Sequence, residues 1–218
     1  MTIIQSNSNF NLEELSVEQP NGMQGGTYCC NIKYNGDDML LQTTKCELKN
    51  FKPNKGYIDI VVDDTNYIYD ILQDVENHMK DYIFEKQHLW FNNNLEESDI
   101  DYLFSDSLKK SKKNLYFRVY LPKQRTFRNV TTFKVFNENE QEISLDSIEP
   151  NTTKKVISIF QLNSLKFTST SFKLFFVIKQ MLVLDNINFS KCIIQTNVKE
   201  NKNNADDKKN EMENVEND

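Results

Sequence analysis

The sequence predicts a mainly β domain of the α+β class, with helices inserted between strands. Segments with the two-residue period of strands come first and last, and a segment with a helical period lies between them. The 218 residues suit one domain with tails, and 15 Phe and 9 Tyr provide large buried areas. This order favours an α+β fold, or a small barrel with a helical insertion, over alternating β-α units.

The first strands are expected at residues 27–34, 39–45 and 56–62, which Asn, Gly and Pro residues separate. In the third segment, alternate side chains fall on opposite faces of the strand. Ile58, Ile60 and Val62 share one face, and Tyr57, Asp59 and Val61 share the other. This alternation is typical of a strand with one face in the core.

A helical insertion is expected over residues 64–106. Apolar residues recur at three- and four-residue spacing between 68 and 83, which predicts one helix with a buried face. A second, short helix is expected over 95–104. Trp90 and Phe91 follow the first helix and are predicted to fill the core there, not to stack on bases. The apolar stripe consists of Ile68, Ile71, Leu72, Val75, Met79 and Ile83.

The strand period returns after residue 109, and the chain ends in a polar segment. The later strands are expected at 115–121, 131–136, 154–162 and 171–184. The two terminal segments offer little apolar surface to bury, which is typical of disordered chain. The predicted organisation is a flexible N-terminal segment (1–26), a folded domain (27–198) and a disordered acidic tail (199–218).

The cysteines and the apolar runs of the sequence indicate in which cellular compartment the protein is expected. No run has the length and apolar character of a transmembrane helix, and the first residues lack the pattern of a signal peptide. The four cysteines show no disulfide-framework spacing, which indicates reduced thiols in a cytosolic or nuclear protein that is not secreted. With two histidines and no Cys-x-x-Cys pair, neither a metal site nor another cofactor is expected.

Charge is segregated along a chain whose net charge is −6. Thirteen acidic residues and two lysines lie between Asp59 and Asp106, whereas nine basic residues and no acidic one lie between Lys109 and Lys134. This distribution says more about the partner than the net charge does. The tail adds the acidic residues Asp206, Asp207, Glu211, Glu213, Glu216 and Asp218.

The strand at 115–121 carries Tyr116, Arg118 and Tyr120 on the face turned away from the core. Single-stranded nucleic acid needs rings that stack on bases and cations that meet phosphates, so this pattern favours a nucleic-acid-binding face. The predicted base contacts are Tyr116, Tyr120 and Phe175. The predicted phosphate contacts are Arg118, Lys123, Arg125, Arg128, Lys134, Lys173 and Lys179, with Lys109, Lys110, Lys112 and Lys113 as an extension.

Other interpretations of these residues stay open. The basic segment can be an ordinary solvated face, and the acidic helix at 66–86 can cover the aromatic side chains. An enzyme is not expected, because the sequence has no Gly-rich phosphate loop, no G-x-S-x-G and no H-E-x-x-H motif. The paired carboxylates at 63–64 and 96–97 are sufficiently explained as helix starts.

Four segments carry a resemblance to a known family, namely 40–49, 89–109, 115–122 and 154–184. The last is the most specific, since it combines a strand, a turn and an aromatic-rich strand that reaches Gln180. Over residues 27–184 the sequence resembles the single-stranded DNA-binding proteins of podovirus-like phages and their relatives in nucleocytoplasmic large DNA viruses. The resemblance implies an OB-fold barrel with a helical insertion, a cationic groove for single strands and an acidic, disordered C-terminal tail.

The resemblance also implies two roles for the tail, which competes with DNA for the groove and recruits replication proteins. In the phage members the tail ends in an aromatic residue, whereas this chain ends in Val-Glu-Asn-Asp, so docking of a polymerase by the tail tip is not carried over. The chain is predicted to bind single-stranded DNA without sequence preference in viral replication, recombination or repair, in the host cytoplasm or nucleus. The alternative is a virion structural or assembly protein that uses the barrel for protein contacts. A preference for DNA over RNA, and a homodimer, are left open.

Overall fold

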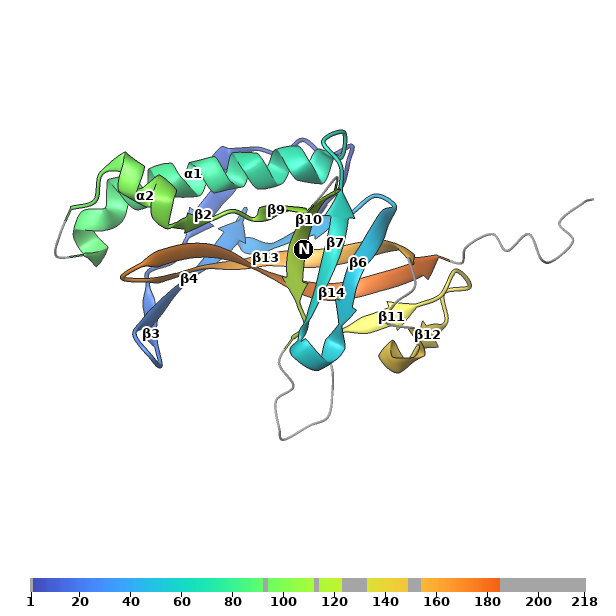
Figure 1. The fold of residues 1–218 in the computed structure, drawn as a ribbon. Coiled ribbons are helices and arrows are strands. Elements are labelled where there is room, and N and C mark those ends of the chain that lie inside the picture. The colour runs from blue at the N-terminus through green and yellow to red at the C-terminus, as the bar shows by residue number, and fades with distance from the viewer. Residues whose placement is uncertain (1, 92–93, 112–113, 123–132, 149–153, 185–218) are drawn as a thin grey trace, which may run out of the picture. The chain divides into compact units, whose positions relative to one another are not determined.

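The computed structural model describes residues 2–91, 94–111, 114–122, 133–148 and 154–184, which form a mainly β fold with one helical insertion (Figure 1). The helices are α1 (Tyr67–Trp90) and α2 (Glu97–Leu103), with short 3-10 turns η1 (Leu12–Glu14), η2 (Pro53–Lys55) and η3 (Leu145–Ser147). The strands are β1 (Ile3–Ile4), β2 (Leu15–Val17), β3 (Asn21–Met23), β4 (Thr27–Tyr34), β5 (Asp37–Gln42), β6 (Cys46–Lys52), β7 (Tyr57–Val62), β8 (Phe104–Ser105), β9 (Leu108–Ser111), β10 (Asn114–Tyr120), β11 (Lys134–Phe136), β12 (Glu142–Ile143), β13 (Lys155–Thr168) and β14 (Ser171–Leu184).

Five strands close into a barrel. β13 pairs with β6, β6 with β7, and β7 with β10, all antiparallel. β10 then pairs in parallel with β14, and β14 pairs with β13 to complete the ring. A five-stranded Greek-key ring of this kind is the architecture of an OB-fold. The predicted mainly β, OB-fold-like barrel is therefore confirmed.

The barrel interior is filled by large apolar side chains from alternate strand positions. The rings of Phe117 and Phe160 lie 4.9 Å apart, and Phe176 completes the group at 6.1 Å from Phe117. Ile58 and Ile60 of β7 are fully buried, as the alternation of that strand predicts. Such packing holds the strands rigidly, so the side chains on their outer faces keep fixed positions.

The N-terminal residues differ from the flexible segment that the sequence predicts over 1–26. β1 pairs with β5, and β2 and β3 pair with β4, so these residues extend the sheet. The physical reason is a small number of well-placed apolar contacts. Ile4 is buried, and the ring of Phe10 stacks on Tyr34 with the centroids 5.6 Å apart.

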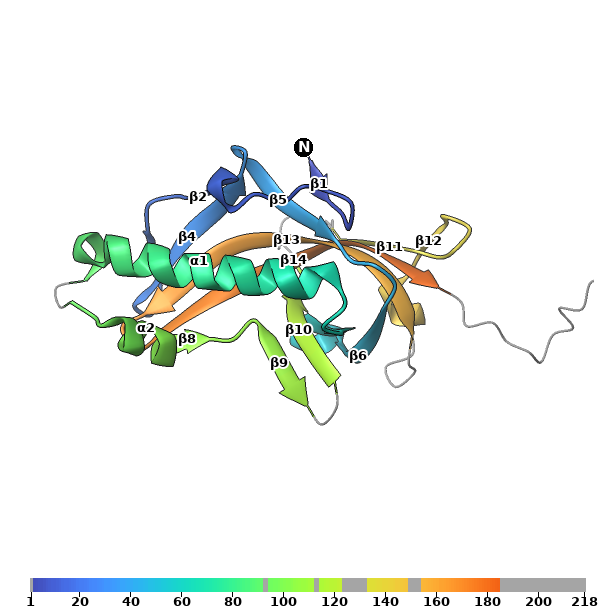
Figure 2. The same ribbon diagram turned by 90° about the horizontal axis from the view of Figure 1, so that it is seen from above.

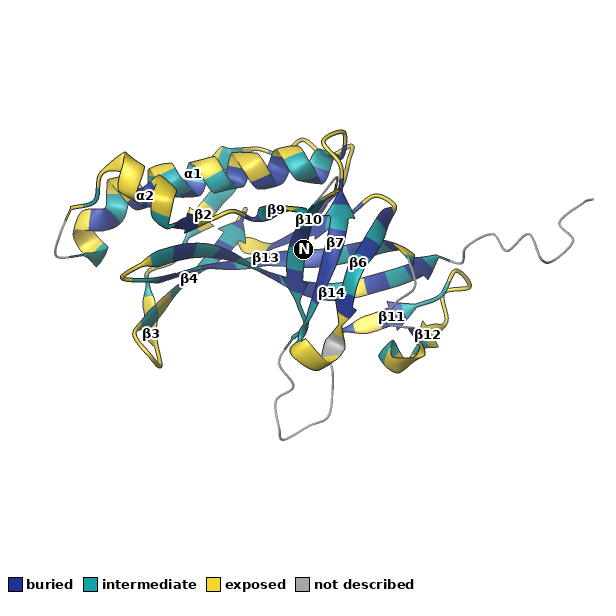
Figure 3. Ribbon diagram, viewed as in Figure 1, coloured by how far each residue is buried: buried dark blue, intermediate teal, exposed yellow. Residues whose placement is uncertain are grey.

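The helical insertion lies along one side of the β13–β14 hairpin (Figure 2). α1 begins after Asn66, whose side chain accepts a hydrogen bond from the Ile68 N–H, and the predicted apolar stripe is buried. At its C-terminal end, Trp90 stacks on Phe167 with centroids 5.3 Å apart, and both α1 and α2 fall within the predicted insertion. The predicted core-filling role of Trp90 and Phe91 is thus confirmed, since Phe91 also packs edge-on against Phe172. Figure 3 shows the alternation of buried and exposed residues along α1.

None of the helices in the described part of the chain is long and apolar enough to cross a membrane.

Candidate nucleic-acid interface

The outer face of β6, β7 and β10 carries rows of side chains that the strand register brings together. One row consists of Asn50, Asp59 and Arg118, and the next of Lys52, Tyr57 and Tyr120. In Figure 1 these three strands face the viewer and no helix lies in front of them. The rows therefore form a continuous, partly exposed surface across the barrel.

Three aromatic rings meet on this face. Phe175 of β14 stacks on Tyr120 with the ring centroids 4.4 Å apart and an interplanar angle of 16°. Tyr57 of β7 lies edge-on to Tyr120 at 6.5 Å. All three side chains are half-buried, so they are held by their neighbours and still reach solvent. We call Tyr57, Tyr120 and Phe175 the aromatic cluster.

Two lysines from the β13–β14 hairpin flank the aromatic cluster. The Lys166 ammonium lies 3.3 Å from the centroid of Phe175. The Lys173 ammonium donates a hydrogen bond of 2.9 Å to the Tyr120 hydroxyl. Positive charge is thus fixed within a few ångströms of ring surfaces, which is the combination that a nucleotide with its base and phosphate requires.

Arg118 is held by a buried carboxylate. Its Nε and Nη2 donate to the two oxygens of Asp59 at 2.7 and 3.0 Å, and Asn50 donates to the same carboxylate at 2.8 Å. The guanidinium also stacks on the ring of Tyr57 at 3.6 Å. The hydrogen bond to Asp59 raises the pKa of Arg118 above its ordinary value, so the group stays charged. Arg118 neutralises Asp59 and fixes Tyr57, which the sequence pattern does not reveal; its contact with phosphate stays a prediction.

Lys49 occupies a β-bulge, because the register of β6 and β7 shifts between Leu48 and Asn50. Its ammonium lies 3.9 Å from the centroid of Tyr116. The nitrogen is buried, and it has no hydrogen-bond acceptor among the described residues. An ammonium has three protons to donate, so this nitrogen can bind an anionic oxygen once the Lys49 side chain turns outward from Tyr116.

Replacing Lys49 with alanine is expected to weaken binding to single-stranded DNA by about three- to tenfold and to lower the salt slope by about one, because one phosphate contact is lost. Lys80 on α1 forms a 3.0 Å ion pair with Asp101 and serves as the matched control, since its loss removes the same charge away from this face. The slope is measured from anisotropy titrations over a range of salt concentrations. An unchanged slope in Lys49→Ala would exclude the phosphate contact.

The other residues that the sequence predicts for the site lie on β9, β11 and β14, or outside the described residues. Lys109 of β9 lies opposite Tyr116 and shares its face, whereas Lys110 lies opposite Leu115 on the other face. Lys134 of β11 pairs with Glu142 at 2.8 Å, in a row with Gln180 of β14. Lys179 lies further along β14. Outside the described residues lie Lys112, Lys113, Lys123, Arg125, Arg128 and the tail residues Asp206, Asp207, Glu211, Glu213, Glu216 and Asp218.

The acidic helix does not cover this surface. Trp90 and Phe91 at the end of α1 pack against Phe167 and Phe172. Those residues alternate along their strands with Lys166 and Lys173, so α1 packs on the opposite face of the hairpin. The helix at 66–86 therefore leaves uncovered the face of the β13–β14 hairpin that carries Lys166, Lys173 and Phe175.

No family model matches the chain, and no curated protein matches it by sequence. The structure is similar to gp2.5, a single-stranded DNA-binding protein encoded by bacteriophage T7, with 8% identity and a TM-score of 0.46 over 72% of this chain and 98% of that one.

It is also similar to the single-stranded DNA-binding protein from bacteriophage Enc34, with 10% identity and a TM-score of 0.42 over 83% of this chain and 96% of that one. The same Enc34 protein in complex with single-stranded DNA gives 10% identity and a TM-score of 0.41 over 78% and 96% of the two chains.

Proposed function

We propose that the protein binds single-stranded DNA without sequence preference across the outer face of its barrel. The observation that carries this proposal is the aromatic cluster with Lys166 and Lys173 fixed beside it. Ring faces stack on any base, and lysines meet any phosphate, so affinity needs no particular sequence. A duplex hides its base faces, and single strands are therefore preferred.

The position of the face supports the proposal by analogy at the level of the fold. In OB-folds, oligonucleotides bind on the face of the second and third strands. Counted along the chain, β7 and β10 are the second and third of the five barrel strands here. Tyr57 and Tyr120 are on these two strands, and Phe175 is on β14, which adjoins β10.

A protein that coats single strands serves reactions that expose them. Replication, recombination and repair of viral DNA in the host cytoplasm or nucleus are the roles that we propose. The acidic tail is proposed to recruit replication proteins to the coated strand.

Binding is tested by fluorescence anisotropy of a labelled oligo-dT of about 20 nucleotides, longer than most OB-fold sites. We expect tight binding in low salt, a linear decrease of log affinity with log salt, and much weaker binding of the matched duplex. A protein that bound no oligo-dT even in low salt would contradict the proposal. Equal affinity for the duplex would contradict the stacking mechanism.

Removal of the acidic tail is expected to strengthen binding. A chain that ends at Glu200 loses six acidic residues and three lysines, so the remaining protein is less negative. Electrostatic competition predicts a gain of about three- to tenfold in low salt that disappears as salt screens the charges. Equal affinity of the two proteins at all salt concentrations would exclude competition by the tail.

A further inference from the structure

The face that carries the aromatic cluster continues beyond the barrel to the sheet edge. The register joins Lys173 of β14 to Lys166 of β13, Lys166 to Cys29 of β4, and Cys29 to Asn21 of β3. Side chains in one row of a sheet point to the same side. This row therefore extends the surface of Lys173 and Phe175 onto the β3–β4 hairpin.

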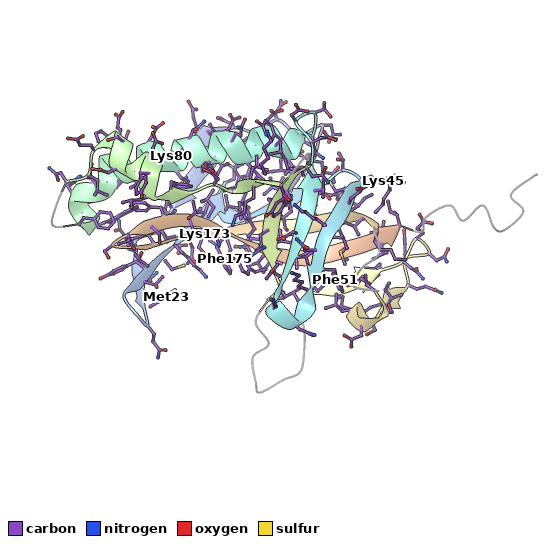
Figure 4. The ribbon with its side chains drawn as sticks, in the orientation of Figure 1. Met23, Lys45, Phe51, Lys80, Lys173 and Phe175 are labelled. Carbon is purple, nitrogen blue, oxygen red and sulfur yellow. The ribbon has the colours of Figure 1, made fainter. Side chains whose placement is uncertain are left out.

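Met23 lies on this same side, two residues after Asn21 on β3. Its side chain is 49% exposed although it is large and apolar. The opposite side of the hairpin is occupied by Tyr28, which stacks on Phe167 at 5.4 Å. In Figure 4, Met23, Lys173 and Phe175 all lie on the side of the strands away from α1.

The chemistry of the hairpin suits bases and not phosphates. Residues 19–32 contain no charged side chain. The tip turns at Gly25 and Gly26, which both have positive φ. A thioether contacts aromatic surfaces favourably, and apolar side chains are used by many proteins to contact or separate bases. Lys166 on β13, the strand next to β4, and Lys173 on β14, the strand after it, would contact the adjacent phosphates.

We infer that the bound single strand leaves the aromatic cluster across β14, β13 and β4, and that Met23 on β3 contacts one of its bases. From β14 to β3 the path crosses three strand spacings, about 14 Å, which is room for up to about four stacked nucleotides. The β3–β4 hairpin thus lengthens the binding site. This inference rests on the proposed function.

Cys29 reports directly on whether the strand crosses β4. It is half-buried, whereas Cys30 and Cys46 are buried and burial raises the pKa of Cys30 to about 12. Cys192 lies outside the described residues and is replaced, as Cys192→Ser, in the protein used. At neutral pH a thiol reagent is then expected to react at Cys29, and saturating oligo-dT of about 20 nucleotides is expected to slow this reaction at least about fivefold.

An unchanged rate of thiol reaction, in a sample that anisotropy shows to be saturated with oligo-dT, would overturn the inference and leave the proposed function intact. Absence of binding in the anisotropy assay would instead overturn the proposed function. The two failures are therefore distinguished in one sample.

The contact of Met23 is tested by length dependence. Met23→Ser is expected to weaken binding of the long oligo-dT by about three- to tenfold. It is expected to leave an oligo-dT of about three nucleotides unaffected, because that strand is too short to reach from the aromatic cluster to β3. Gln24→Ala, at the exposed tip beside Met23, is the matched control. Equal effects of Met23→Ser on both lengths would overturn the inference. If Met23→Ser changed the oligomeric state measured by sedimentation, but affected both oligo-dT lengths alike, Met23 would be assigned to a contact between copies of the protein. That result would also overturn the inference.

Discussion

Replacing Tyr120 and Phe175 together with alanine is expected to weaken oligo-dT binding at least about thirtyfold. Each base stack lost is worth about 1–3 kcal/mol. The two rings cover one face of each other, so bases stack on their outer faces, and the outer face of Phe175 is available once the Lys166 ammonium moves aside. The rings stack on each other at 4.4 Å, so a single replacement leaves the other ring without its neighbour. The double variant removes both surfaces together and gives the clearer result. Binding is measured by anisotropy at a fixed salt concentration.

The control for this experiment is Tyr102→Ala. Tyr102 is 88% exposed on α2, away from the barrel face, so its loss removes an aromatic ring without touching the aromatic cluster. Both proteins are melted to confirm that they fold. If Tyr120→Ala with Phe175→Ala bound oligo-dT as tightly as Tyr102→Ala, the aromatic cluster would have no part in binding.

Arg118→Met is expected to destabilise the fold by about 3–5 kcal/mol. The Asp59 carboxylate is completely buried, and Arg118 is its charged partner. Removing one partner of a buried ion pair leaves an uncompensated charge, which is the costly case. Asn50 still donates one hydrogen bond to Asp59, which limits the loss. The free energy of unfolding is measured by urea denaturation.

A double replacement separates this role from a phosphate contact. Asp59→Asn combined with Arg118→Met removes both charges, so most of the lost stability is expected to return. The double variant still lacks the guanidinium, so a salt slope lowered by about one would identify a direct contact of Arg118 with phosphate. A loss of affinity with an unchanged salt slope would instead reflect the lost stack of Arg118 on Tyr57. A single variant Arg118→Met with unchanged stability would show that the ion pair contributes little to the fold.

The faces of individual strands are predictable from the sequence because the period of a strand is short and local. Alternation correctly separates Phe117, which is buried, from Tyr120 on the outer face. It likewise separates Leu174 and Phe176, which are buried, from Phe175. The stripe of α1 is predictable for the same reason, since its period is contained in one segment.

The neighbours of these residues are not predictable in this way, because they depend on register between distant strands. Asp59 meets Arg118 from 59 residues away, and one step of register would separate them. Lys49 reaches Tyr116 through a bulge, which no spacing rule reveals. Tyr57 could have been noticed, since it alternates onto the same face as Asp59, but only the β7–β10 pairing brings it to Tyr120.

The closed ring also determines when the protein becomes functional during its own synthesis. The backbone N–H of Ser158 donates a hydrogen bond to the Thr43 hydroxyl, which lies 115 residues earlier in the chain. The ring itself closes only when β14, which ends at Leu184, has paired with β10 and β13. Contacts of such long range form late and slowly. Tyr120 leaves the ribosome well before Phe175, and the aromatic cluster cannot assemble until both have emerged. A translating ribosome therefore carries a chain whose aromatic cluster is incomplete until β14 has emerged, and the proposed binding of single strands has to wait for that step.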